Sequence, residues 1–141
     1  MTNTPPDAAA GTSPAAAGGI GHLPLALFAA PMGLGGLGLA WREAGRVLGA
    51  PALVGEAVLA LAGLVWVGLF ALHLLRAGRH PQMLAGDLRH PIRSAFLGAI
   101  TIVLMLIAGG HGPHAPGLAV AVWGVAVGAH LAIGVWTVRG L

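Results

Sequence analysis

The chain has 141 residues, of which 57% are hydrophobic and 8% charged, whereas a soluble domain carries roughly 25% charged residues, so a water-soluble globular fold is excluded. Disorder of the whole chain is excluded too, because disorder requires low hydrophobicity, and a membrane protein is the class that remains. The net charge of +3 comes from seven Arg and four acidic residues. The Arg are spread between apolar stretches, which does not indicate a nucleic-acid partner. The chain has no Cys, which excludes disulfides, thiolate nucleophiles and Cys-based zinc sites.

Residues 1–21 are rich in Ala, Pro, Gly, Ser and Thr and contain no large apolar cluster. Such a segment buries too little surface to offset the entropy of ordering, so we expect a disordered tail. It also lacks the basic start of a signal peptide. The remaining residues, 22–141, are predicted to form one transmembrane domain.

Four apolar segments follow the tail, and each is long enough to cross ~30 Å of hydrocarbon as a helix of about 20 residues. None alternates with period two, as the strands of a membrane barrel do. We therefore predict an all-α membrane protein with four transmembrane helices arranged as two helical hairpins. The predicted helices cover residues 23–41, 53–75, 94–110 and 117–138.

The Arg residues predict the orientation of these helices. The connection at residues 76–93 carries four Arg, whereas the one at residues 111–116 carries none. Cytoplasmic loops are enriched in Arg and Lys, so we expect residues 76–93 and both termini in the cytoplasm. The protein would then be a multi-pass protein of the inner or plasma membrane.

The first apolar segment has Pro31 at its middle, followed by Gly33 and Gly36. A Pro kinks a helix and frees a backbone carbonyl, and Gly lets an ion approach the backbone. The alternative interpretation is helix packing, because small residues are common where membrane helices meet. The same alternative is favoured for Gly124 and Gly128 in the fourth segment.

The third segment places Ser94, Gly98 and Thr101 on one helix face, because they are four and three residues apart. Small residues with hydroxyl donors suit a narrow path for an anion. Alternatively, the hydroxyls bond to the backbone of their own helix, as is frequent in membranes.

The sequence contains seven His, which raises the question of a metal or haem. His73 and His130 could clamp a haem in principle, but their expected depths differ by roughly 9 Å. We predict no metal and no cofactor, and keep a b-type haem protein as an unfavoured alternative. No nucleophile with a base, phosphate-binding loop or carboxylate pair is found, so we do not expect an enzyme.

Three segments resemble the tellurite-resistance/dicarboxylate transporter family, which includes the plant slow-type anion channels. Its first helix typically ends in a Gly-rich run before Trp-Arg, matched by Met32, Gly33, Gly36, Leu37, Gly38, Leu39, Ala40, Trp41 and Arg42. The start of its third helix is matched by His90, Pro91, Arg93, Ser94 and Phe96, and its fourth helix by Trp123, Gly124 and Trp136. The resemblance covers residues 23–141.

This resemblance implies a fold of ten helices in five hairpins, a trimer, and a pore in each protomer lined by the odd-numbered helices. It implies transport of anions of the chloride, nitrate, sulfite, tellurite or C4-dicarboxylate class. Pro31, Gly33, Gly36, Ser94, Gly98 and Thr101 become candidate pore-lining residues. Arg42, Arg89 and Arg93 become candidates for attracting anions, although Arg residues at helix ends also serve simply to fix topology.

The chain supplies two of the five hairpins that the resemblance implies, and two hairpins cannot enclose a pore alone. It is therefore expected to be the N-terminal part of a longer anion channel or transporter, a subunit of which several copies assemble, or a remnant. The alternative from another class is a complete four-helix membrane protein with a structural or assembly role.

Overall fold

A computed structural model describes residues 22–140, apart from the side chain of Pro91. The predicted tail at residues 1–21 lies outside this part of the chain. The elements are a 3₁₀ helix η2 (Leu25–Phe28) and the helices α1 (Ala29–Leu48), α2 (Ala52–Arg79), α3 (Pro81–Arg89), α4 (Pro91–Ala95), α5 (Leu97–His111) and α6 (Pro116–Arg139).

Four helical spans within the described residues are long and apolar enough to cross a membrane. They run over Leu25–Leu48, Ala52–Arg79, Ile92–His111 and Pro116–Arg139. The first combines η2 with α1, and the third combines most of α4 with α5. The predicted all-α fold with four transmembrane helices is thereby confirmed.

Two connections are more helical than the sequence predicts. The first predicted helix ends at residue 41, whereas α1 continues to Leu48, and an exposed ion pair of 3.1 Å joins Arg46 to Glu43 in its last turns. The helix α1 ends at Gly49, whose φ of 72° lies in the left-handed region that Gly tolerates. The second connection contains α3, which begins with Pro at its first turn, where its missing N–H costs nothing.

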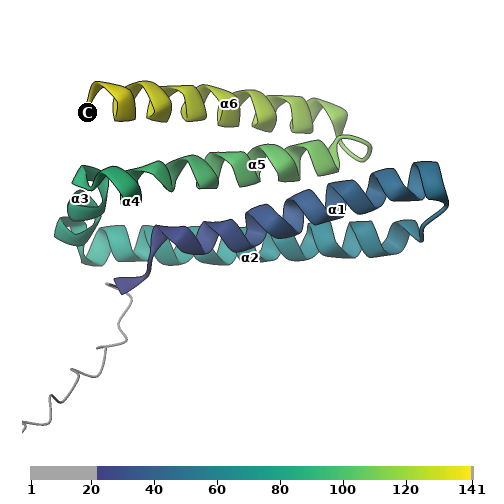
Figure 1. The fold of residues 1–141 in the computed structure, drawn as a ribbon, viewed down its shortest axis with the longest axis horizontal. Helices are drawn as coiled ribbons and strands as arrows, with labels where there is room; N and C mark the ends of the chain where they lie inside the picture. The colour runs from purple at the N-terminus through teal and green to yellow at the C-terminus, as the bar shows by residue number, and fades with distance from the viewer. Residues whose placement is uncertain (1–21, 141) are drawn as a thin grey trace, which may run out of the picture.

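The helices form two hairpins, α1 with α2 and α5 with α6, and the hairpins meet where α1 packs against α5. Figure 1 shows α5 between α6 and the α1–α2 hairpin, and α2 contacts α5 as well. The C-terminus, α3 and the start of η2 lie at one end of the molecule, and the α1–α2 and α5–α6 connections lie at the other (Figure 1). The helices α1, α2 and α5 therefore meet one another, and α6 packs on α5.

The helices α1, α2 and α5 meet around Leu59 of α2, whose side chain is buried. A Cβ placed at Gly38 of α1 would lie 2.6 Å from its Cγ, and one placed at Gly110 of α5 would lie 3.1 Å from its Cδ2. Leu59 thus fills a space that exists only because both other helices present glycine. Across the same junction, Trp66 Nε1 donates to the carbonyl of Ile100 at 3.0 Å.

Large apolar side chains cover the outward faces of α2 and α6. Because water would penalise this much exposed apolar surface, these faces suit lipid or further helices. The exposed residues include Leu61, Leu64, Val67, Leu72, Leu74 and Leu75 on α2, and Leu118, Val120, Trp123, Val125, Leu131, Val135 and Trp136 on α6.

Candidate functional site

The glycines of α1 divide between two faces of the helix. Gly35 and Gly38 face the core, since an added Cβ would contact Leu106 or Leu59. Gly33 and Gly36 face open space, with no atom within 4 Å of an added Cβ. Of the three candidates on this helix, Pro31 is buried, and only Gly33 and Gly36 lie on the open face.

Arg42 joins three helices at one end of the molecule. Its Nε and Nη2 donate to Oε1 of Glu56 on α2 at 2.9 and 2.7 Å. Its Nη1 donates to the carbonyl of Gly110 in the last turn of α5, where carbonyls lack partners within the helix. His114 contacts the other Glu56 oxygen at 3.3 Å. The Arg42 charge is therefore compensated by a carboxylate and used to hold α1, α2 and α5 together.

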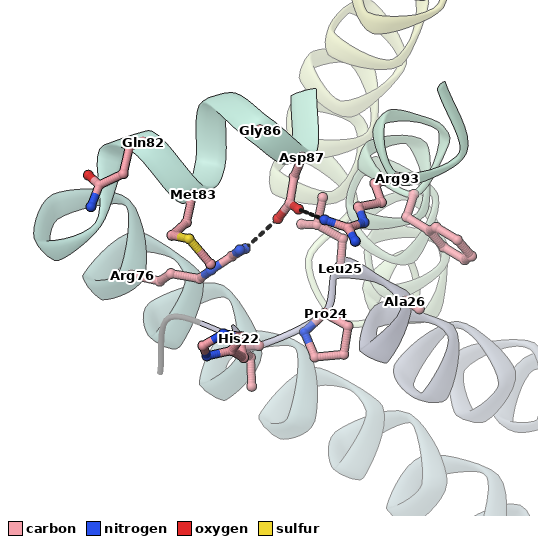
Figure 2. A pocket seen from close by; sticks show the side chains of 12 residues that line it. His22, Pro24, Leu25, Ala26, Arg76, Gln82, Met83, Gly86, Asp87 and Arg93 are labelled. Atoms are coloured by element: carbon pink, nitrogen blue, oxygen red, sulfur yellow. Dashed lines mark hydrogen bonds and ion pairs between the residues drawn. The ribbon is translucent and has the colours of Figure 1, made fainter. Parts of the chain in front are cut away.

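A second ionic cluster lies at the opposite end, where Asp87 of α3 is held between two guanidinium groups. Its carboxylate lies 2.7 Å from Nη1 of Arg76 on α2 and 3.1 Å from Nη1 of Arg93 on α4. Figure 2 shows the carboxylate directed between the two arginines. The side chains of Arg76 and Asp87 are only 4% and 7% exposed, whereas that of Arg93 is 61% exposed. Two positive charges thus share one negative charge.

A cavity of about 330 Å³ opens beside this second cluster. Its wall includes His22, Pro24, Leu25, Arg76, Gln82, Met83, Asp87, Arg93 and Phe96, most of which are labelled in Figure 2. Arg89, the remaining sequence candidate for attracting anions, is exposed at the end of α3 and does not line the cavity. Of the three candidate arginines, Arg93 is the one placed at a cavity with excess positive charge.

The candidate face of α5 packs against α6. Thr101 is buried, donates to the carbonyl of Gly98 at 2.9 Å and lies 2.8 Å from Nδ1 of His130. A Cβ placed at Gly98 would lie 3.3 Å from Cε1 of His130. Ser94, at the end of α4, is also buried. The predicted shared face is therefore directed at α6, and Gly33 and Gly36 lie on a different helix surface.

A second cavity, of about 230 Å³, lies between α5 and α6. Its polar lining comes from Ser94, His130 and Thr137, and the rest is apolar. The Thr137 hydroxyl bonds to the carbonyl of Ile133 in its own helix at 2.8 Å. His130 is the one titratable group among the lining residues.

The two intramembrane histidines have separate surroundings. His73 on α2 contacts the ring of Phe28 with the centroids 5.0 Å apart, and its Nδ1 lies 2.8 Å from the carbonyl of Leu69. His130 lies on α6, which α5 separates from the α1–α2 hairpin (Figure 1). Within residues 22–140, no group of three or more His, Asp or Glu side chains is placed to hold a metal ion.

Sequence reasoning did not select Glu56 or Asp87 as site residues and considered His130 only as a haem ligand, whereas the structure makes all three central. Two of them are acids in a chain that has only four, and each lies in or beside an apolar segment. An intramembrane ionisable residue is itself a signal of function or pairing. The sequence contained that signal, but the identity of each partner depends on how helices pack.

Comparison with protein families gave one finding, and it covers the whole described part of the chain. The family model described as voltage-dependent anion channel, SLAC1, matches residues 22–140. Comparison with curated proteins and with solved structures gave no significant match.

Proposed function

Because the chain belongs to the SLAC1 family of voltage-dependent anion channels, we propose that it forms part of a passage that carries small anions across a membrane. The family consists of membrane channels and transporters rather than enzymes. The observation that carries the proposal is the family match over residues 22–140, on a chain whose four spans have the required length and apolarity.

The proposed passage is lined by α1 and α5. Two observations support this choice: α1 and α5 pack against each other, and the open face of α1 carries Gly33 and Gly36. Glycines on an open face leave room for an anion next to the helix backbone. Pro31 lies in the first turn of α1, where a proline does not interrupt the helix. Ser94, Gly98 and Thr101 remain lining candidates, but on the side of α5 that faces α6.

The proposed substrates are small inorganic anions or C4-dicarboxylates, with chloride, nitrate, sulfite, tellurite and malate as the candidates to assay. The lining candidates include no Lys or Arg, and hydroxyl and backbone dipoles suit weak binding and rapid release of an anion. The cluster of Arg76, Asp87 and Arg93 would raise the local anion concentration at one mouth.

The proposed assembly is a homo-oligomer, and a trimer is the form that the family resemblance implies. Gly124 and Gly128 on α6 support further helix contacts, because nothing in the described part of the chain, apart from the adjacent backbone of α6, lies within 4 Å of a Cβ placed at either one. Small residues are what closely packed membrane helices present to each other. Other copies, or other helices of a longer chain, would cover this stripe.

We propose further that the protein lies in the inner or plasma membrane, with residues 22–141 as its transmembrane domain and residues 1–21 as a cytoplasmic tail. Arg76, Arg79, Arg89 and Arg93 support this orientation, since they gather at the end of the molecule where the described chain begins. Cysteine labelling at residue 10 and at residue 113, in intact cells, would test it.

The proposed function is tested by anion flux. The protein, in the form extracted from its native membrane, is reconstituted in liposomes, and uptake of chloride, nitrate and malate is measured. We expect flux of at least one anion above empty liposomes, and a tenfold or greater loss for Gly36→Leu, whose side chain would occupy the open face of α1. Gly63→Leu on α2, also without neighbours within 4 Å, is the matched control. An absence of flux for every anion would contradict the proposal and favour a structural subunit.

A further inference from the structure

The cavity between α5 and α6 contains a histidine whose protonation form can be worked out from its bonds. A threonine hydroxyl has one proton to donate. Thr101 lies within bonding distance of two groups, the Gly98 carbonyl at 2.9 Å and Nδ1 of His130 at 2.8 Å. The carbonyl can only accept, so both bonds exist together only if Thr101 donates to Gly98 and His130 donates its Nδ1 proton to Thr101.

This arrangement leaves Nε2 of neutral His130 with a lone pair. The hydrogen bonds among residues 22–140 include none to that atom. A proton can therefore be added at Nε2 while the Nδ1 bond to Thr101 is kept. Burial of Thr101, together with the close approach of Gly98 to the ring, holds the imidazole in place in both forms.

The protonated ring would need a negative charge nearby, and the elements packed against α6 within residues 22–140 provide none that is unpaired. The titratable or charged groups on the elements packed against α6 are Arg93 on α4, which is paired with Asp87, and His111 at the far end of α5. α6 itself adds Arg139, nine residues beyond His130 and roughly 14 Å along the helix. All of these groups are basic, and Asp87 is already shared by two arginines.

We propose that the cavity between α5 and α6 binds a small anion together with a proton, and that Nε2 of His130 carries the proton. The proton comes from solvent and forms an imidazolium, and the anion in the 230 Å³ cavity balances its charge. The pair enters and leaves as a neutral unit, which is far less costly within a membrane than either ion alone. This proposal rests on the proposed function and names the place where anion and proton meet.

The test is a titration of His130 by NMR on ¹⁵N-histidine-labelled protein in nanodiscs, from pH 5 to 8, in nitrate and in gluconate. Because binding is reciprocal, an anion that prefers the imidazolium raises the midpoint pH of His130. A tenfold preference raises it by up to one pH unit. His130→Gln identifies the signal, and His73, whose ring lies tilted against that of Phe28 on another helix, is the internal control.

We expect the His130 midpoint to be higher in nitrate than in gluconate, while the His73 signal is equal in both. Equal midpoints for His130, or no titration of it across this range, would overturn the proposal. The neutral form is expected as the Nδ1–H tautomer, and Thr101→Val is expected to mix the two tautomers. Thr137→Val, in the same cavity but bonded to Ile133, should leave the tautomer unchanged.

Nitrate flux into liposomes separates this proposal from the proposed function. If wild-type protein carries no anion, the proposed function fails, whereas the midpoint of His130 is measured without any flux. If flux is found, we expect it to rise toward acidic pH in wild type and in His73→Gln. We expect it to be independent of pH in His130→Gln, and a retained pH dependence there would contradict the role of His130.

Discussion

The two ends of the molecule both place arginine next to apolar helices, and they compensate its charge in different ways. At the α1–α2 turn, Arg42 meets one carboxylate, Glu56, and donates from Nη1 to the carbonyl of Gly110. At the other end, Arg76 and Arg93 share the single carboxylate of Asp87 beside an open cavity. The first cluster is balanced in charge and joins three long helices, whereas the second carries an excess positive charge and joins α3 to its neighbours.

The comparison shows that the role of an arginine near a membrane surface depends on the groups that it contacts. By sequence, Arg42 and Arg93 are equivalent candidates for attracting anions. By structure, the charge of Arg42 is compensated and its side chain is only 22% exposed, so its role is to hold helices. Arg93 is 61% exposed beside a cavity, which suits the attraction of anions. The variants below test this division, from the largest expected effect to the smallest.

The largest effect is expected for Asp87→Asn. This change leaves the buried guanidinium of Arg76 without its carboxylate, and breaking a buried ion pair costs about 3–5 kcal/mol. Denaturant unfolding of the protein in detergent, followed by circular dichroism, measures the loss. Glu43→Gln, which removes an exposed ion pair with Arg46, is the control and should change stability by under about 1 kcal/mol. An equal effect of the two variants would refute the importance of burial.

A smaller effect is expected for Arg42→Gln. The buried carbonyl of Gly110 loses its donor, and an unsatisfied buried acceptor costs about 1–3 kcal/mol. The same unfolding measurement applies, with Arg46→Gln as the control at the same end, since Arg46 is 77% exposed. We expect no change of ion selectivity in any flux that remains. A selectivity change without a stability loss would reverse the roles given to Arg42 and Arg93.

Arg93→Gln is expected to change transport rather than stability. Its pair with Asp87 is exposed on the arginine side, so unfolding should shift by under about 1 kcal/mol. Anion flux should fall by about two- to tenfold at low ionic strength, because the mouth loses its excess charge. The difference should shrink above about 0.1 M salt, where the screening length falls to about 10 Å. Arg46→Gln, at the opposite end, should not reproduce this salt dependence.

The smallest effect is expected for His114→Ala. His114 is 62% exposed and contacts Glu56 at 3.3 Å, whereas Arg42 already supplies two hydrogen bonds to that carboxylate. Unfolding should change by no more than about 0.5 kcal/mol. A larger loss would mean that the cluster around Arg42 depends on its outermost member.

The fold was largely predictable because the membrane restricts it so strongly. Long apolar segments with few charges can only be spanning helices, and all four were located from that property alone. The helix ends were not, because Arg42, Glu43 and Arg46 look like a charged loop in the sequence. Their partners, Glu56 and Gly110 for Arg42 and a one-turn neighbour for Arg46, are what keep them in α1.

The candidate site was predictable only within single helices. Helical periodicity placed Gly98 and Thr101 on one face, and both contact the same residue, His130. Periodicity says nothing about which neighbour that face meets, because the rotation of α5 is fixed by Trp66, Leu59 and α6. For the same reason, the sequence did not distinguish the open Gly33 and Gly36 from the packed Gly35 and Gly38.

The short turn between α1 and α2 also constrains how this protein is made. Only Gly49, Ala50 and Pro51 lie between the two helices. We therefore expect them to enter the bilayer as a hairpin rather than in separate steps. In the predicted orientation the turn crosses the bilayer and takes Arg42 and Glu56 with it, so their ion pair would already offset charge during insertion.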